Sequence, residues 1–564
     1  MFAAPPFGGA FFMEKLAFFV EKHKAECICF ALFILAAVFG FCVHEPWYDE
    51  AQAWQIARTA SWHDMVWVIP HWEGHPPFWH LFLAIPAKLG VPWQWAFPII
   101  GMSLILINGF LLFFKAPFPR WVRCLLPFNY FLFLQYGVIV RPYSVMVFLM
   151  LLLAIYFPQK DKRPYLFSGL LAALSACHLF GLAVAGGITL AWLWEIKAHQ
   201  SWGTYIKQLV TDKRFYGMAV LLVWALLLLA GVWRTDSFLQ TYHELTVSHL
   251  RYTIYVFLCL PAEAVLTDFN ASLQRMFEVL PWKELLITSG IGVLLWTSVF
   301  YFFPRKKWLY LVLPYMLFGG ILLQYGSRHH VGVVLALFIW YIWISVAHTS
   351  LEVKPRFMHI LGNVLLILVL CVPVGWSLTG LYNEYRYVTF PGKEIVAFLK
   401  KHQLMQAPIF ASWIMFKGKS PDEYQTNPNA QPYSVLLNMY LKHNIILNFN
   451  NGEDKGYVMN YSPNPQEAEK ILKNWQAIGV PAVLLGPAAI PQLFADMSLE
   501  KKYAVGYAGY TYSNWKFQHV PTKFPIYLHR DIWEYISGMS LEKFRQLQEQ
   551  AKTRVPVSAE IINR

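Results

Sequence analysis

Two adjacent carboxylates follow the first long apolar stretch of the chain. They lie in the run Tyr48-Asp49-Glu50, on the other side of that stretch from a lysine-rich N-terminus. Ionisable residues beside a membrane are costly and mark a functional site by default. A carboxylate within hydrogen-bonding reach of a hydroxyl group can take its proton, and partial burial beside a like charge favours that role. We therefore interpret Asp49 and Glu50 as an acid/base site in which one carboxylate reacts and the other orients or binds.

A helix cap is the alternative explanation for the acidic pair. Asp49 precedes a helix-like stretch at 51–58. Acidic residues are favoured at helix N-termini, where they accept hydrogen bonds from backbone N–H groups and balance the helix dipole. The two roles are compatible, so both stay open.

Two further polar residues stand next to prolines beside apolar stretches. His75 precedes Pro76-Pro77, and the two prolines enforce an extended approach and then allow a helix to begin. Arg141 opens the run Arg141-Pro142-Tyr143, and its forked guanidinium is suited to binding a phosphate. The alternative for Arg141 is a charge that snorkels from a helix end toward water.

A second basic cluster, Ser327-Arg328-His329-His330, lies between two later apolar stretches. Arg141 and Arg328 together could clamp a lipid-linked phosphate or diphosphate where it leaves the bilayer. We assign four residues to phosphate binding: Arg141, Tyr143, Arg328 and His329.

The remaining histidines carry weaker signals. His75 and His178 are further site candidates, although His178 is more simply a hydrogen-bonded histidine of the protein core. A metal site built from His71, His75 and the carboxylates matches no structural zinc spacing, so we assign no metal ligand.

The composition places most of the chain in lipid. Of 564 residues, 57% are hydrophobic and 14% are charged, whereas a soluble globular chain carries about 25% charged residues. The net charge of +13 comes from basic clusters between apolar runs, as the positive-inside rule expects. Nucleic acid is therefore excluded as a partner.

These basic clusters also orient the chain. They mark cytoplasmic loops, so the loops that hold the acidic pair, His75, Arg141, His178 and 328–330 face outward. Several apolar stretches are short, and 78–90 or 95–114 would be interfacial, so we expect about 11 to 13 transmembrane helices. The stretches lie at roughly 25–43, 95–114, 124–140, 143–157, 164–176, 182–196, 217–233, 285–303, 308–323, 331–346 and 359–376.

The chain then divides into three parts. We expect a cytoplasmic tail at 1–24, a helical membrane domain at 25–376 whose first stretch is an uncleaved anchor and whose first external loop is 44–77, and an external α/β domain at 377–564. In the last part, apolar bursts alternate with helix-like stretches, as in a compact α/β domain. The bursts lie at 409–411, 445–447 and 482–485, and the helix-like stretches at 391–403 and 465–478.

The order of these motifs resembles the GT-C glycosyltransferase superfamily. A first span is followed by Tyr-Asp-Glu-Ala at 48–51, an aromatic loop, His-Pro-Pro at 75–77 and Arg-Pro-Tyr at 141–143. The pattern looks most like the branch of protein O-mannosyltransferases and lipid A aminoarabinose transferases. The resemblance is sharpest over residues 44–85, and the general helical architecture extends it to about residue 376.

The resemblance implies a polyprenyl- or dolichyl-phosphate sugar donor and inverting transfer on the non-cytoplasmic face. Asp49 matches the aspartate of the family's first loop, which would be the general base, and Glu50 matches its acidic neighbour. His75 departs from the lysine that precedes the two prolines in many relatives. Some members of the family use a divalent cation and others do not, so the resemblance does not decide whether this protein needs one. It implies no other cofactor. We expect a bacterial inner membrane, with a lipid, glycan or protein acceptor.

Two other classes remain as alternatives. A membrane-bound acyltransferase could use His329 or His330 as its base, but it would leave Asp49-Glu50 unexplained. A lipid or solute transporter typically carries ionisable residues near the bilayer midplane together with an internal repeat. Here the charged residues gather at one face and no repeat is evident, so glycosyl transfer is the favoured interpretation.

Overall fold

The structure is a computed structural model that divides into two compact units. The first, here called the helical unit, comprises residues 1–44, 61–386 and 514–518, and the second, here called the mixed unit, comprises 45–60, 387–513 and 519–564. The structure describes residues 19–198, 200–233, 247–266, 282–324, 328–347, 356–411, 414–416, 424–426, 431–458, 473, 481–486, 503–515, 518–540, 542–543 and 546.

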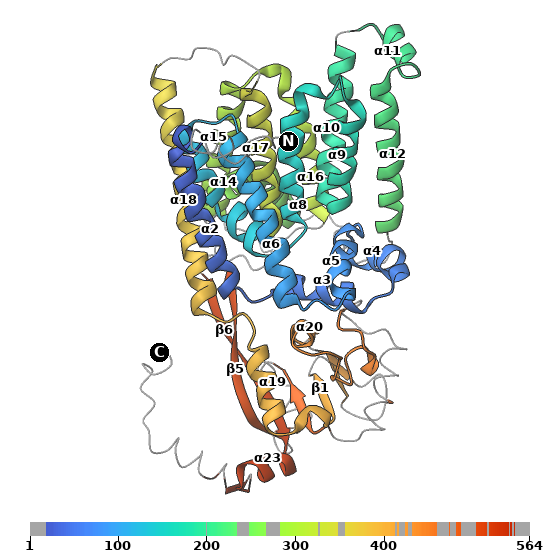
Figure 1. Ribbon diagram of the computed structural model, residues 1–564, viewed down its shortest axis with the longest axis vertical. Helices are drawn as coiled ribbons and strands as arrows, with labels where there is room; N and C mark the ends of the chain where they lie inside the picture. Colours follow the sequence, from blue (N-terminus) through green and yellow to red (C-terminus); the bar gives the residue numbers. More distant parts are fainter. Residues whose placement is uncertain are drawn as a thin grey trace, which may run out of the picture. The chain divides into compact units, whose positions relative to one another are not determined.

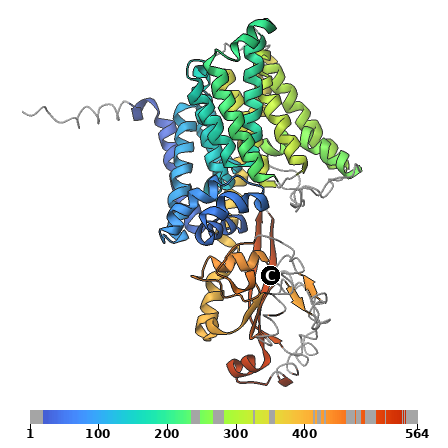
Figure 2. The same ribbon diagram turned by 90° about the vertical axis from the view of Figure 1, so that its right-hand side faces the viewer.

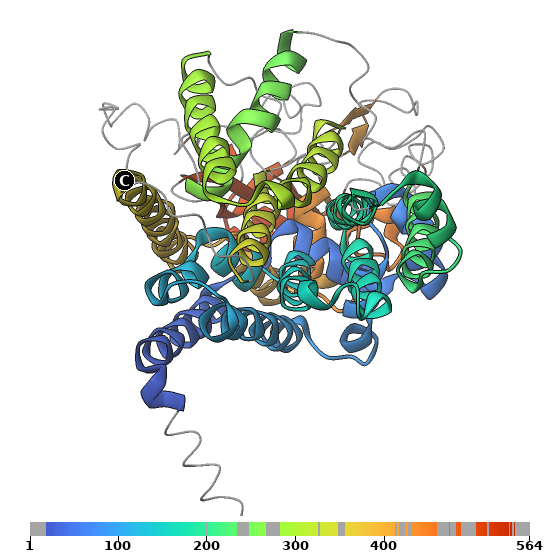
Figure 3. The ribbon, with the colours of Figure 1, turned by 90° about the horizontal axis from the view of Figure 1, so that it is seen from above.

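The helical unit is a bundle of apolar helices, seen from the side in Figure 1 and end-on in Figure 3. Within the described residues, seven helical segments are long and apolar enough to cross a membrane, and three apolar helices are shorter. This confirms the expectation of a multi-pass helical architecture. The main helices are α2 (Lys24–Val43), α6 (Trp93–Phe110), α8 (Tyr143–Tyr156), α9 (Pro164–Cys177), α10 (Leu179–Ala198), α12 (Lys213–Val232), α15 (Trp282–Phe302), α16 (Leu309–Gln324), α17 (Val331–Val346) and α18 (Arg356–Arg386).

Shorter helices complete this unit. The stretch 78–90, for which we left an interfacial position open, contains α5 (Phe78–Lys88), whose 11 residues are too few to cross the hydrocarbon core. The other short helices are α4 (Ile69–Glu73), α7 (Arg120–Leu125), α11 (Trp202–Gln208), α13 (Val247–Ile254) and α14 (Leu260–Leu266). The unit also contains the π-helical segments η1 (Asp64–Val68), η2 (Leu111–Lys115), η4 (Phe131–Val138) and η7 (Tyr255–Cys259).

Two stretches differ from the sequence-based expectation. The predicted span 124–140 is not one helix, because the chain breaks around Pro127 and the Asn129 side chain accepts a hydrogen bond from the Phe131 N–H, 3.0 Å away. The apolar stretches predicted from the sequence leave out the region 234–283. In the structure, residues 247–266 of this region are helical and bury an apolar face.

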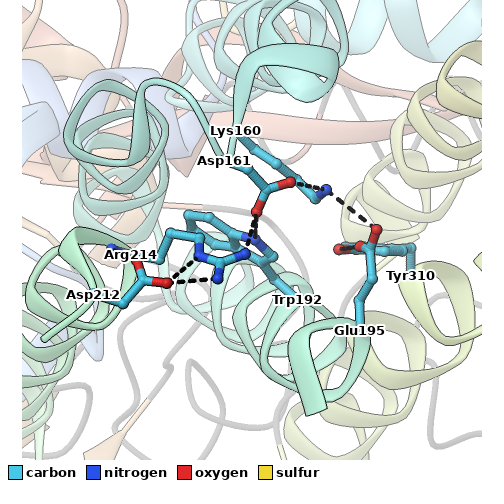
Figure 4. Close-up of polar contacts among 7 residues, drawn as sticks. All are labelled: Lys160, Asp161, Trp192, Glu195, Asp212, Arg214 and Tyr310. Atoms are coloured by element: carbon cyan, nitrogen blue, oxygen red, sulfur yellow. Dashed lines mark hydrogen bonds and ion pairs between the residues drawn. The ribbon is translucent and has the colours of Figure 1, made fainter. Parts of the chain in front are cut away.

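A network of charged and polar side chains joins the ends of α9, α10, α12 and α16 (Figure 4). Asp161 accepts hydrogen bonds from Lys160 at 2.9 Å, from the Trp192 indole at 3.0 Å and from Arg214 at 3.2 Å. Burial alone would raise the pKa of Asp161, but these hydrogen bonds lower it below its ordinary value. Glu195 accepts from Lys160 and from the Tyr310 hydroxyl, which extends the network to α16.

The mixed unit contains a four-stranded sheet in the order β1-β4-β6-β5. β1 (Ile409–Ala411) pairs in parallel with β4 (Val483–Leu485), which pairs antiparallel with β6 (Gln518–His529), and β5 (Tyr503–Trp515) lies at the edge. β5 and β6 form the long pair of strands in Figure 2. A second, antiparallel pair joins β2 (Ile414–Phe416) to β3 (Tyr424–Thr426). The helices are α3 (Tyr48–Thr59), α19 (Gly392–Lys401), α20 (Gln431–Asn438) and α23 (Arg530–Ser537).

The sequence pattern located part of this unit. The bursts 409–411 and 482–485 correspond to β1 and β4, and the helix-like stretch 391–403 corresponds to α19. The burst 445–447 provides an isolated bridge between Ile446 and Ile409. The predicted helix 465–478 lies outside the described residues, apart from Lys473. The long strands β5 and β6 were not expected.

Helices α10 and α16 pack closely at Gly187. A Cβ atom at this position would lie 2.3 Å from the backbone of Pro314, whereas at Gly186 it would meet only Leu317, at 3.5 Å. Contacts as short as 2.3 Å force backbone shifts, so this packing requires glycine at 187.

We predict that Gly187→Ala destabilises the protein by about 1–3 kcal/mol, since α10 and α16 must separate. Thermal unfolding in detergent measures the effect. Gly186→Ala is the matched control on the same helix, because its new methyl group makes ordinary contacts. Equal melting temperatures of the two variants would contradict the close approach of α10 to α16.

Candidate functional site

Six polar residues from four separate turns gather in the helical unit. His75 lies between α4 and α5, Arg141 and Tyr143 lie at the start of α8, and His178 separates α9 from α10. His329 and His330 belong to η9 (Arg328–His330), just before α17. We call this set the histidine–arginine cluster: His75, Arg141, Tyr143, His178, His329 and His330.

The local sequence sets the position of each turn. Gly74 ends α4 with φ of 68°, a left-handed conformation that glycine adopts without strain, and Pro76-Pro77 then lead into α5. Pro142 precedes the first residue of α8, where proline is well tolerated because no helical N–H bond is lost. His178 is extended, with φ of −167° and ψ of 156°, so a single residue interrupts the helix.

Hydrogen bonds fix the protonation pattern of two histidines. Arg141 Nη2 donates to His329 Nε2 over 2.9 Å. A guanidinium cannot accept, so the Nε2 atom of His329 carries no proton. The Phe180 N–H donates to His178 Nδ1 over 3.1 Å, so neutral His178 carries its proton on Nε2 and donates it to the Tyr143 hydroxyl, 3.1 Å away.

Ring contacts connect the remaining members. The His75 and His178 rings are 4.2 Å apart, as are those of His329 and His330. The Arg141 guanidinium carbon lies 5.0 Å from the centre of the Tyr143 ring, within the range of a cation–π contact. The structure thus brings together five residues that the sequence singled out for the site, Arg141, Tyr143, His329, His75 and His178, with His330, which the sequence had offered only as the base of an acyltransferase.

Burial makes the histidines of this cluster neutral. It lowers the pKa of His75 to about 4, and the charge of Arg141 acts in the same direction. Burial, together with the neighbouring charged and titratable groups, also holds the pKa of His178, His329 and His330 well below the ordinary value. Arg141 itself is 7% exposed. A buried guanidinium therefore stands among neutral imidazoles.

Arg328 was expected to share phosphate binding with Arg141. Its backbone belongs to η9, but its side chain lies outside the described residues. The two-arginine clamp therefore stays a prediction.

The acidic pair belongs to the mixed unit. Helix α3 begins at Tyr48 with Trp47 as its N-cap, so Asp49 is its second residue and not the cap. Glu50, the third residue, is buried, and its Oε2 accepts a hydrogen bond from the Trp47 N–H at 2.8 Å. Asp49 is therefore not the N-cap residue, but it lies in the first turn, where an acidic residue balances the helix dipole. Glu50 makes the capping hydrogen bond, and the base role of Asp49 stays a prediction.

Helix α3 is attached to a segment that follows it by 380 to 406 residues in the chain. The Gln52 amide donates to the Val458 carbonyl over 2.6 Å and accepts from the Val458 N–H over 2.9 Å. Arg58 donates to the carbonyls of Leu441, at 2.7 Å, and Asn438, at 3.4 Å. Sequence reasoning missed Gln52 and Arg58, because contacts with such distant residues leave no local pattern.

No group of three or more His, Cys, Asp or Glu side chains among the described residues could hold a metal ion. His71, considered with His75 as a ligand, instead places its Nδ1 atom 3.1 Å from the Trp233 carbonyl at the end of α12. The chain was also compared with protein-family models, with curated proteins and with solved structures, and no match was found.

We predict that Gln52→Ala loosens α3 from the Val458 segment. Losing this pair of hydrogen bonds leaves two buried backbone groups of Val458 without their partner, which costs about 1–3 kcal/mol. Faster hydrogen exchange of the α3 amides, measured by mass spectrometry, would report it. Lys393→Ala is a suitable control, because its ion pair with Glu45 spans 3.7 Å and its side chain is exposed. Unchanged exchange in Gln52→Ala would show that this contact does not hold α3.

Proposed function

We propose that this protein is a membrane glycosyltransferase. It transfers a sugar from a polyprenyl-phosphate donor to an acceptor hydroxyl on the non-cytoplasmic face, with inversion and with Asp49 as the general base. The observation that carries the proposal is the buried arginine of the histidine–arginine cluster, which lies at the ends of several helices.

A buried guanidinium favours an anionic partner. Removing a charge from water is costly, and a nearby opposite charge offsets that cost. The planar fork of Arg141 matches the paired oxygens of a phosphate group. The neutral imidazoles around it add hydrogen-bonding groups without repelling an anion.

Helix N-termini add to this preference. Each turn of the cluster leads directly into a helix: His75 into α5, Arg141 into α8, His178 into α10, and His330 into α17. A helix N-terminus carries partial positive charge and backbone N–H groups, so it is a ready anion-binding site. Four such ends meet at this cluster, which supports a phosphate as its ligand.

The placement of charge supports an outward orientation. The network of Lys160, Asp161, Glu195 and Arg214 gathers at the ends of α9, α10 and α12 that the basic loops mark as cytoplasmic. His178 lies at the opposite ends of α9 and α10. We therefore place the histidine–arginine cluster at the outer leaflet, where the headgroup of a lipid donor would be.

Two side chains, Asp49 and Arg141, have separate roles in the proposed reaction. Asp49 takes the proton of the acceptor hydroxyl while the acceptor oxygen bonds to the anomeric carbon. The bond between that carbon and the phosphate oxygen breaks, and its electron pair leaves with the lipid phosphate. Arg141 stabilises the additional negative charge. Glu50 is engaged as a helix cap, so we assign the base role to Asp49.

The finer assignments are part of the same proposal. We propose about 11 to 13 transmembrane helices, a bacterial inner membrane location, and an external position for the C-terminal domain. The acceptor is a lipid, a glycan or a protein. No step is assigned to a divalent cation.

We predict that Asp49→Asn lowers transfer by about a hundred- to ten-thousand-fold, because it removes the proton acceptor. Purified protein, a panel of radiolabelled polyprenyl-phosphate sugars and membrane extract would show which label moves and how fast. Asp64→Asn serves as the control, since this half-exposed carboxylate pairs with His63 at the protein surface.

Two outcomes would contradict this assignment. Wild-type turnover in Asp49→Asn with loss of turnover in Glu50→Gln would transfer the base role to Glu50. Failure of every polyprenyl-phosphate sugar to donate its label to any component of the extract would contradict glycosyl transfer itself.

A further inference from the structure

We infer that the histidine–arginine cluster binds its anion together with a proton, which His329 takes up when the anion replaces it as the partner of Arg141. This inference rests on the proposed phosphate site and adds that the ligand enters as an anion and a proton together.

The bond between Arg141 and His329 is the starting point. Arg141 Nη2 donates to the unprotonated Nε2 of His329 over 2.9 Å. A phosphate oxygen is the stronger acceptor, because it carries negative charge and because two phosphate oxygens can accept from the guanidinium fork in parallel, which a single imidazole lone pair cannot do. When an anion engages Nη2, the lone pair of His329 Nε2 loses its donor and becomes available to a proton.

The members of the cluster differ in exposure. Arg141, Tyr143, His178 and His330 are buried, whereas His329 and His75 are only half-buried. His329 is therefore both the partner of Arg141 and one of the more exposed members of the cluster.

His178 is unsuited to taking up this proton. Its Nδ1 accepts from the Phe180 N–H and its Nε2 donates to Tyr143, so both ring nitrogens are committed in the neutral form. His330 is fully buried and contacts the Phe180 ring at 4.5 Å. His75 is the competing candidate. Among the side chains that the structure describes, the titratable and charged groups around the His329 ring include Arg141, Tyr143, His178, His330 and His75, and the Tyr136 hydroxyl donates to the His329 carbonyl.

Electrostatics gives the direction of the coupling. Without an anion, burial and the charge of Arg141 lower the pKa of His329. A bound anion offsets the charge of Arg141 and attracts an imidazolium, so the pKa of His329 rises on binding. A group whose pKa rises on binding takes up a proton between its two pKa values. At pH values below the pKa of His329 in the free protein, the dissociation constant of the anion does not change with pH. Between that pKa and the higher pKa of His329 in the complex, the dissociation constant increases about tenfold per pH unit.

The coupling suits the proposed reaction. The donor is a phosphodiester with one negative charge, and the departing lipid phosphate is a monoester that gains a second. A protonated His329 beside Arg141 would supply a second positive charge at this position. In the absence of ligand the described imidazoles of the site are neutral, and Arg141 contributes its positive charge.

We propose to test this with the full-length protein in detergent and a methyl diester of farnesyl phosphate as the probe. This diester holds one charge at all relevant pH values, so any proton exchanged belongs to the protein. Isothermal titration calorimetry at pH 7 in buffers of different ionisation enthalpy measures the protons taken up. We expect about one proton per bound diester for the wild type.

Matched variants assign the proton. His329→Gln keeps an acceptor for Arg141 but cannot titrate, so it should bind the diester with no proton uptake. His75→Gln should retain the uptake. Uptake that persists in His329→Gln and disappears in His75→Gln would overturn the assignment to His329.

The remaining outcomes separate this inference from the proposed function. Wild-type binding whose enthalpy does not depend on the buffer, or whose dissociation constant is unchanged between pH 5 and 8, would overturn the coupling and leave the phosphate site. No binding of the diester would overturn both. Proton-coupled binding without sugar transfer from any donor would support the coupling and contradict the glycosyltransferase proposal.

Discussion

The buried charge of Arg141 is the constraint on which the candidate site depends. A guanidinium removed from water destabilises the fold unless its surroundings are arranged around it. Here the Nε2 lone pair of His329 accepts one of its N–H groups, and the Tyr143 ring presents its face to the charge. The other histidines avoid repulsion by staying neutral. The described side chains of the cluster are therefore arranged around the charge of Arg141.

This arrangement depends on packing far from Arg141. The turns of the cluster are short because each helix begins one to three residues after the polar side chain that precedes it. A shift of α10 relative to α16 would therefore move His178 as well. The close contact at Gly187, about halfway along α10, and the network around Asp161, near the far end of α10, hold these helices together. Stability of the bundle and geometry of the site are thus coupled through rigid helices.

The sequence predicted what depends on local composition. Long apolar stretches located the main helices, and polar residues beside prolines identified Arg141, Tyr143 and His75 as candidates. It could not predict that Arg141 donates to His329, since 188 residues separate them and only packing brings them together. The sequence offered His330 only as a base in the acyltransferase alternative, although it is among the most buried members of the cluster. The break at Pro127 was readable in principle, but the hydrophobicity of 124–140 concealed it.

Helix α3 has a consequence for how the protein is made. Its Gln52 finds its partner, Val458, only 406 residues later in the chain. At about 5–20 residues per second, a ribosome needs roughly 20–80 s to synthesise that distance. For this interval the acidic helix emerges without the surface that receives it. Residues 48–59 are therefore a segment that a translocation machinery or chaperone would bind and shield during synthesis.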